Sequence, residues 1–237
     1  MAATIQDLQQ NRLLNLLPRE DQRRIARDLV PVDLRRGDEL LDVSIPVNDV
    51  HFVLEGSISV IMIMSDGSAF EGRAVGFEGA LGLVAGAGGT RRPFRRGIVQ
   101  FGGKALKISA IRLKQLVEES AGIRDMAMRN AEIVVFTMLQ TAACNALHPL
   151  ESRLGRWLLM ARDRIRKSEL RVTHEYLAEA LGVHRPAVTL ALKSLRKYGL
   201  ASGRGYVRID DAASLEEATC ECYRTIKYQL DEMLAAG

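Results

Sequence analysis

The sequence has little cysteine: its 237 residues include only Cys144, Cys220 and Cys222. They form no CxxC pair and no even-numbered framework of the secreted type, which excludes a small domain held together by disulfides. Cys220 and Cys222 stand near the end of the chain, where we expect them to pack against apolar side chains. A redox role for these two thiols is the alternative that the sequence leaves open.

Long apolar segments are also missing. The longest uncharged stretch with a helical pattern, residues 133–147, contains polar residues such as Thr137 and Asn145. It is shorter than the roughly 20 apolar residues that a membrane span needs. Residues 1–12 are polar and lack the apolar centre of a secretion signal. We therefore expect a soluble cytoplasmic protein with no membrane partner.

Catalytic and metal-binding patterns are absent as well. The sequence has no GxSxG, no HExxH and no pair of carboxylates close to a histidine. Its histidines are scattered, at positions 51, 148, 174 and 184. His51 falls in a predicted strand, where we expect it to pack rather than to bind haem. These absences predict a protein that is not an enzyme, with no cofactor and no metal site.

Charge is unevenly distributed along the chain. Residues 1–150 contain 18 Lys+Arg and 17 Asp+Glu, residues 151–208 contain 13 and 5, and residues 209–237 contain 2 and 7. The middle segment therefore has a net charge of +8, whereas the last segment has −5. A basic module between a neutral body and an acidic tail indicates a polyanionic partner, with a solvated basic face as the alternative.

Short strands with turn signals fill residues 32–109, after two helices that the spacing predicts within residues 13–29. Two β-rich runs flank Asp66-Gly67, a favoured hairpin turn. Residues 98–109 are expected to form a further strand pair, with Gly102-Gly103 between its halves. Short strands at near-regular spacing predict an antiparallel sandwich or barrel.

A helical pattern follows from residue 111 onward. Small and apolar residues recur along it at helical spacing, namely Ala127, Ala131, Val134, Met138 and Ala142. Both flanks are apolar and residues 133–147 carry no charge, so this helix must be buried on more than one side. We expect it to pair with a second copy of the chain, with a central core helix of a monomer as the alternative. Pro149 marks the end of the helix and a domain boundary.

Residues 172–200 have the pattern of a helix-turn-helix. Thr173 is placed to cap a short first helix, and Gly182 can take the positive φ of the tight turn. A second helix is expected from about Arg185 to Tyr198, followed by a β-hairpin wing. A second helix set steeply against the first can enter the major groove of DNA.

The second helix carries side chains suited to reading DNA. Arg185 lies at its N-terminal end, where a guanidinium can bond guanine O6 and N7. One turn on, Thr189 can meet a thymine methyl group or a phosphate, and Lys193 suits a phosphate where the helix leaves the groove. Three further candidate DNA contacts flank the helix: Thr173, His184 and Arg204. A winged helix that serves only protein contacts is the alternative.

The order of a β-rich domain, a long helix and a basic winged helix resembles the CRP/FNR family of bacterial transcription regulators along nearly the whole chain. The resemblance rests on LRRGDELL at 34–41, NDVHFVLEGSISVIM at 48–62, the turn at Asp66-Gly67 and TxxxLAxxLGVHRPAVTxALKxL at 173–195. It implies an α+β fold with a double-stranded β-helix (jelly-roll) sensor domain at 1–120, a dimerisation helix at 121–148 and a winged helix-turn-helix domain at 149–237. It also implies a homodimer on a palindromic operator in double-stranded DNA, with RNA polymerase as a further partner.

The effector pocket of the family has diverged in this sequence. In the cyclic-nucleotide branch, a Gly-Glu pair and an arginine followed by a small hydroxyl residue clasp the ligand. Here Glu78 precedes Gly79, and the arginines at the matching distance, Arg95 and Arg96, are not followed by Ser or Thr. We therefore expect a regulator that cyclic AMP does not control, with an effector that the sequence does not identify. The alternatives are a related regulator that responds to a cyclic nucleotide or another anion, and a β-barrel enzyme or small-molecule binding protein.

Other parts of the chain depart from the family too. Pro186 and Leu190 stand where the best-known branch has an acidic residue and a second arginine, so that branch's operator does not carry over. The cysteine cluster that holds an iron–sulfur centre in the oxygen-sensing branch is missing, because no cysteine precedes Cys144. Beyond the wing, the spacing of apolar residues from Leu215 to Leu230 predicts one extra amphipathic helix.

Overall fold

The computed structural model describes residues 3–235 and divides into two compact units. The sheet unit comprises Met1–Val60, Ala74–Phe136 and Leu230–Gly237, and the helical unit comprises Ile61–Arg73 and Thr137–Gln229. Among residues 3–235, no helix has the length and apolar character needed to cross a membrane.

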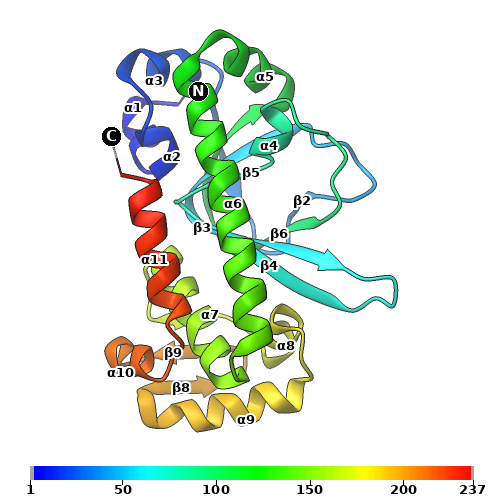
Figure 1. Cartoon of the computed structure of the whole chain (residues 1–237), viewed down its shortest axis with the longest axis vertical. Helices are drawn as coiled ribbons and strands as arrows, with labels where there is room; N and C mark the ends of the chain where they lie inside the picture. Colours follow the sequence, from blue (N-terminus) through cyan, green and yellow to red (C-terminus); the bar gives the residue numbers. More distant parts are fainter. Residues whose placement is uncertain (1–2, 236–237) are drawn as a thin grey trace. The chain divides into compact units, whose positions relative to one another are not determined.

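The sheet unit begins with three short helices and continues into antiparallel strands (Figure 1). Its first helix is capped by Thr4, and its third begins directly after Pro18. Its elements are α1 (Ile5–Gln9), α2 (Arg12–Asn15), α3 (Arg19–Ala26), β1 (Val30–Leu34), β2 (Glu39–Leu41), β5 (Ala80–Leu81), α4 (Leu83–Gly86), β6 (Arg96–Ser109) and α5 (Ala110–Glu119).

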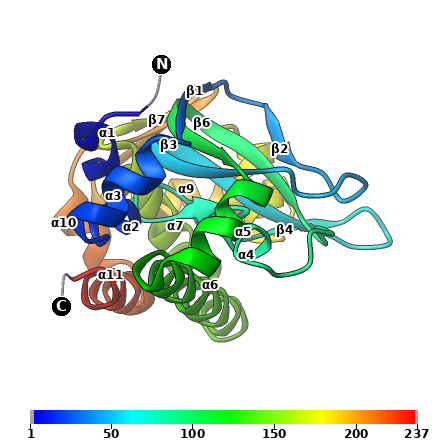
Figure 2. The same ribbon diagram turned by 90° about the horizontal axis from the view of Figure 1, so that it is seen from above.

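Four elements contribute residues to both units: β3 (Asp49–Ile63), β4 (Ala69–Val75), α6 (Ala121–Leu147) and α11 (Cys222–Met233). The main sheet has the strand order β1-β6-β3-β4, with β2 paired to β6 and β5 paired to β3. The apolar core of the sheet unit is formed by Leu34, Leu41, Val47, Val53, Ile58, Val60, Val75, Leu81, Val99 and Ala105. Figure 2 shows α4 beside α5, and α1, α2 and α3 grouped together.

The strand pair expected at residues 98–109 is instead one continuous strand, β6. Gly102-Gly103 makes no turn. Gly103 instead faces the backbone of β3 at very short range, and Gly102 faces the carbonyl oxygen of Leu34 in β1. A Cβ on Gly103 would lie 2.2 Å from the carbonyl oxygen of Glu55, and one on Gly56 would lie 2.3 Å from that of Phe101. The glycines therefore serve a close backbone approach between strands, which the local sequence pattern does not distinguish from a turn.

The helical unit contains the end of α6, a winged helix and two terminal helices (Figure 1). Its small sheet has the order β7-β9-β8. Its elements are α7 (Leu150–Ile165), β7 (Glu169–Leu170), α8 (His174–Leu181), α9 (Arg185–Leu195), a 3-10 turn (Arg196–Tyr198), β8 (Leu200–Gly203), β9 (Tyr206–Ile209), α10 (Ala212–Glu217) and α11 (Cys222–Met233).

The helical unit also includes the tip of the β3–β4 hairpin. Its turn lies at Asp66-Gly67 as predicted, with a φ of +82° at the glycine. The buried carboxylate of Glu71 accepts hydrogen bonds from Trp157 Nε1 at 2.8 Å and from the Tyr176 hydroxyl at 2.9 Å. Within this unit, the hairpin is therefore attached to both α7 and α8.

The prediction of a single amphipathic helix from Leu215 to Leu230 is wrong, because the helix is interrupted. The segment forms two helices, α10 and α11, because α10 ends at Glu217 and α11 begins at Cys222. Leu215, Ile226 and Leu230 are nonetheless buried, as their spacing predicts. The interruption leaves Cys220 in the connection between the two helices.

Candidate nucleic-acid interface

The turn between α8 and α9 is formed by hydrogen bonds and backbone conformations of neighbouring residues, which can be recognised in the sequence. Thr173 caps α8, its Oγ1 accepting a hydrogen bond from the backbone N–H of Tyr176 at 3.1 Å. Gly182 ends that helix with a φ of +64°, a conformation that favours glycine. The N–H of Val183 then bonds the carbonyl of Ala178 at 2.9 Å, which closes the turn.

The second helix, α9, packs one face into the unit and exposes the other. Pro186 lies in its first turn, where a missing N–H costs no hydrogen bond. Its buried residues are Val188, Ala191, Leu192 and Leu195. The 3-10 turn extends the helical path to Tyr198, and Gly199 terminates it with a φ of +72°. The predicted range of 185–198 therefore holds, with a tighter last turn.

Arg185, Thr189 and Lys193 all lie on the exposed side of α9. The guanidinium of Arg185 is 3.9 Å from the carboxylate of Glu175, and both side chains are well exposed, so this contact is weak. The hydroxyl of Thr189 donates to the carbonyl of Arg185 at 3.2 Å and lies 2.9 Å from Nδ1 of His174. This arrangement fixes the Thr189 side chain one turn beyond the arginine.

The other candidate contacts stand at the edges of the same module. His184 is the exposed N-cap residue of α9 and makes no capping hydrogen bond through its side chain. Arg204 is exposed in the turn of the wing, next to Gly205 with a φ of +82°. Arg208 of β9 instead bonds Asp210 at 2.6 Å, and that carboxylate raises the pKa of the arginine. The wing therefore presents Arg204 more openly than Arg208.

In the sheet unit, the predicted effector residues contact other groups of the protein. Glu78 is buried, and the carbonyl of Gly79 accepts a hydrogen bond from Asn11 at 2.9 Å. The guanidinium of Arg96 makes two hydrogen bonds with the carboxylate of Glu39, at 2.5 and 2.7 Å. Arg95 lies over the ring of Phe94, 4.6 Å from its centroid, and partial burial lowers its pKa.

His51 occupies β3 as expected and is buried, with 6% of its surface exposed. Burial disfavours the imidazolium and lowers the pKa of His51 to about 4, partly opposed by the nearby charge of Asp49. The side chain is therefore a neutral imidazole at physiological pH.

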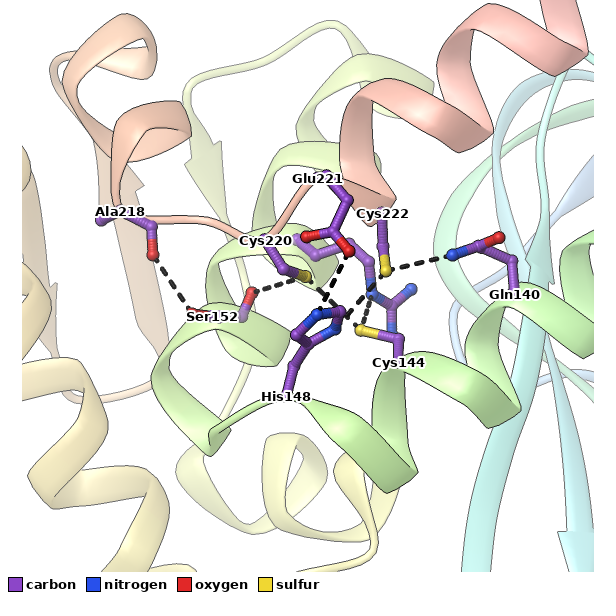
Figure 3. A network of polar contacts seen from close by, with 9 residues as sticks. Gln140, Cys144, His148, Ser152, Ala218, Cys220, Glu221 and Cys222 are labelled. Carbon is purple, nitrogen blue, oxygen red and sulfur yellow. Dashed lines mark hydrogen bonds and ion pairs between the residues drawn. The ribbon is translucent and has the colours of Figure 1, made fainter.

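A cluster that the sequence reasoning missed lies in the helical unit. Cys144, His148, Cys220 and Cys222 point toward one another (Figure 3), and their ligand atoms all lie within 4.8 Å of each other. The pKa of Cys144 is lowered by a hydrogen bond from the Cys220 thiol, whereas the pKa of Cys220 is raised by its neighbour Cys144 and by burial. The available signal was the i, i+4 spacing of Cys144 and His148, which places both on one side of a helix.

Comparisons with known proteins agree with this architecture. Residues 152–218 match the model of the Crp-like helix-turn-helix domain. No curated protein matches the chain. Among solved structures, it is similar to a CRP-family transcriptional regulator from Thermus thermophilus, with 19% identity, a TM-score of 0.65, and coverage of 79% of this chain and 95% of that one.

Two further solved structures share the fold. The c-di-GMP responsive global regulator CLP from Xanthomonas campestris is 17% identical with a TM-score of 0.66, over 81% of this chain and 99% of that one. FixK2 from Bradyrhizobium japonicum is 14% identical with a TM-score of 0.67, over 81% and 98%. The predictions of the fold class and of a helix-turn-helix domain are confirmed. The chain therefore contains a Crp-like helix-turn-helix domain at residues 152–218 and shares the fold of these solved structures.

Proposed function

We propose that two copies of the chain bind a palindromic DNA site, each inserting α9 into the major groove, and that cyclic AMP does not control them. The observation that carries this proposal is the exposed face of α9, where Arg185, Thr189 and Lys193 follow each other at steps of four residues. Such steps return to the same side of a helix, so one groove can meet all three side chains.

In this proposal Arg185 reads a guanine, because it stands at the N-terminal end of α9 and its only described partner is the distant, exposed Glu175. Leu190 is 67% exposed and offers an apolar contact for a thymine methyl group. Pro186 supplies no carboxylate for a cytosine amino group. The half-site is therefore expected to combine guanine with thymine.

Phosphate contacts are assigned to the side chains around that central pair. Lys193 lies two turns beyond Arg185, while His184 precedes the helix. Thr173 begins α8, and Arg204 lies at the tip of the wing. Side chains at these places fix the position of the module on DNA without selecting bases.

Pairing of two copies is supported by exposed apolar side chains on α6. Met128, Val135 and Leu139 are 61%, 59% and 65% exposed, and their spacing of seven and four places them along one stripe of the helix. Ala127, which belongs to the predicted stripe, is instead buried in its own chain. The proposed seam is therefore centred on Met128, Val135 and Leu139.

Arg96, which stands where the family's phosphate-binding arginine is expected, is instead hydrogen-bonded to the carboxylate of Glu39. This contact supports independence from cyclic AMP. A second candidate is a regulator of the same family that responds to another anion. It is favoured by Arg92, which is exposed in the same stretch, and by the Xanthomonas campestris relative, which is described as c-di-GMP responsive.

Selection from random double-stranded DNA tests the proposal. The expected result is a palindrome containing one guanine per half-site that is lost when Arg185→Ala protein is used. Arg224→Ala is the matched control, since Arg224 pairs with Glu216 and lies outside α9. Recovery of no palindrome would contradict the proposal.

Light scattering tests the pairing of two copies. The double variant Val135→Asp, Leu139→Asp is expected to be a monomer with weakened DNA binding. Ile111→Asp, at an equally exposed apolar position on α5, is expected to remain a dimer. A wild-type monomer at all concentrations would contradict this part of the proposal.

A further inference from the structure

We propose that Cys144, His148, Cys220 and Cys222 bind one metal ion of the Zn²⁺ class as a closed Cys₃His site (Figure 3). Cys144 lies near the C-terminal end of α6 and His148 directly follows that helix. Cys220 lies in the connection between α10 and α11, and Cys222 is the first residue of α11. All four residues belong to the helical unit. The inference goes beyond the proposed function and does not depend on it.

Two of the separations between the four side chains are close to those around a tetrahedral ion. With Zn–S near 2.3 Å and Zn–N near 2.05 Å, a tetrahedral site holds two sulfurs about 3.8 Å apart and a sulfur and nitrogen about 3.6 Å apart. The Sγ atoms of Cys144 and Cys220 are 3.5 Å apart, and Sγ of Cys222 is 3.5 Å from Nδ1 of His148. The remaining separations do not exceed 4.8 Å, so movements of about an ångström or less would bring all four ligands into coordination.

The histidine is already oriented for this role. Its Nδ1 faces the sulfur of Cys222, while its Nε2 lies 3.3 Å from the carboxylate of Glu221. Metal-binding histidines commonly donate their second ring N–H to a carboxylate, which fixes the ring and leaves the other nitrogen for the ion. Glu221 is therefore the positioning residue of the site.

Two of the sulfurs also accept hydrogen bonds from neighbouring side chains. The Nε of Arg156 donates to Sγ of Cys144 at 3.2 Å, and the amide of Gln140 donates to Sγ of Cys222 at 3.1 Å. Arg156 is buried, with 6% of its surface exposed, so its cation balances negative charge inside the unit. Three thiolates and one Zn²⁺ carry a net charge of −1, which this guanidinium neutralises. Binding releases the three thiol protons to solvent.

The ligand set also indicates which metal the site would take. Thiolates and imidazole suit zinc, whereas calcium and magnesium require oxygen ligands. An iron–sulfur cluster places its ligands on different irons and so spreads them apart, but here all four ligand atoms lie within 4.8 Å. A single ion with four protein ligands has no open position, so it serves structure and not catalysis.

The ion would link parts of the chain that are distant in sequence. Cys144 and Cys220 are separated by 76 residues that include the whole winged helix. An ion held by both ends would fix the start of α11 against the end of α6 within the helical unit. Loss of the ion would therefore release the terminal segment.

Metal analysis of the full-length protein tests the proposal. Protein purified under reducing conditions without chelator should contain about one zinc per chain, and cobalt substitution should give the charge-transfer and ligand-field absorption of a tetrahedral thiolate site. Thiol titration should find the three cysteines protected until a chelator is added.

Conservative variants locate the site. Cys144→Ser, Cys220→Ser and His148→Asn should each lower zinc affinity by more than the roughly 10–100-fold expected for Glu221→Gln. His184→Asn is the matched histidine control and should keep the metal. Because a serine variant could fail to fold, the cobalt spectrum of the wild-type protein is the deciding measurement.

Three outcomes would overturn the proposal. One is wild-type protein that holds no zinc, gives no tetrahedral cobalt spectrum and has three freely reactive thiols. Another is an iron–sulfur absorption spectrum with acid-labile sulfide. The third is a Cys144–Cys220 disulfide that forms equally fast with and without added zinc.

Discussion

Two arginines of the glycine-rich stretch at residues 75–98, Arg91 and Arg96, differ from Arg185 of α9 in what they contact. In the stretch, Arg91 donates to the carbonyl of Val47 at 2.9 Å and to Asn48 at 2.6 Å, and Arg96 holds Glu39 by two hydrogen bonds. On α9, the nearest acidic partner of Arg185 is 3.9 Å away and exposed.

An arginine cluster in a sequence therefore does not by itself indicate an anion site. A guanidinium that already makes two hydrogen bonds to a carboxylate must break them before the same two donors can hold a phosphate. One that projects from the start of an exposed helix keeps its water and has no such competitor. The predictions below test this contrast, from the largest expected effect to the smallest.

Removing the exposed arginine should have the largest effect. Arg185→Ala is expected to weaken binding to the selected operator by about 1–3 kcal/mol per half-site, because the alanine cannot make the two hydrogen bonds to guanine. Titration of labelled DNA at fixed salt measures this effect. Arg91→Ala, which removes a guanidinium engaged internally by Val47 and Asn48, should leave DNA affinity unchanged in protein that remains folded.

The buried histidine of the sheet unit, His51, should make the free energy of unfolding depend on pH. The pKa of His51 is depressed by burial to about 4, so the unfolded chain takes up its proton at a higher pH than the folded chain does. Stability from this group is thus present above the unfolded pKa near 6.5 and is lost as pH falls toward 4. Between pH 7 and pH 5 the free energy of unfolding should fall by about 2 kcal/mol.

Denaturant titrations of wild-type protein and His51→Leu at both pH values measure this effect. The variant should lack that part of the pH dependence, whereas His174→Leu, at a half-exposed histidine, should keep it. Equal pH dependence in wild type and His51→Leu would show that His51 is not held neutral.

The phosphate contact on α9 should show a smaller effect that depends on salt. Lys193→Ala is expected to weaken binding to all sequences alike. It should also make the slope of log affinity against log salt less steep by about 0.9 for each phosphate that the lysine no longer neutralises. Binding measured across a salt series tests this. An effect confined to one operator sequence would instead assign Lys193 to base reading.

The internal arginine of the stretch should have the smallest effect. Arg96→Gln is expected to lower stability by about 0.2–1 kcal/mol, the range for a partly exposed ion pair, since the two side chains are 38% and 28% exposed. DNA affinity should not respond to cyclic AMP before or after the change, and Arg92→Gln is the matched control. A cyclic AMP response that requires Arg96 would contradict the account, because it would show that the ion pair with Glu39 does not keep Arg96 from binding a ligand.

The helix-turn-helix could be predicted because its signals are local. Thr173 caps the helix that immediately follows it, and Gly182 takes the positive φ of a turn only a few residues away. The signal for the hairpin turn at Asp66-Gly67 is equally local. Local hydrogen bonds and backbone preferences are written in neighbouring residues, so a pattern suffices to find them.

The features that sequence reasoning missed depend on residues far apart in the chain. Gly102-Gly103 makes room for a neighbouring strand near Glu55, and Arg96 meets Glu39 57 residues away. The Cys144–Cys220 contact spans 76 residues. No local pattern marks such partners, because they are brought together only by the sheet register and by the break between α10 and α11.

The central claim is that α9 presents Arg185 to a guanine, and a double-mutant cycle tests it most directly. Affinities are measured for wild type and Arg185→Ala on the selected operator and on an operator with that guanine replaced. The account predicts that replacing the base weakens wild-type binding by about 1–3 kcal/mol and hardly affects the variant, so that the two changes are strongly coupled. Additive effects would contradict it, because they would mean that Arg185 and the guanine do not meet.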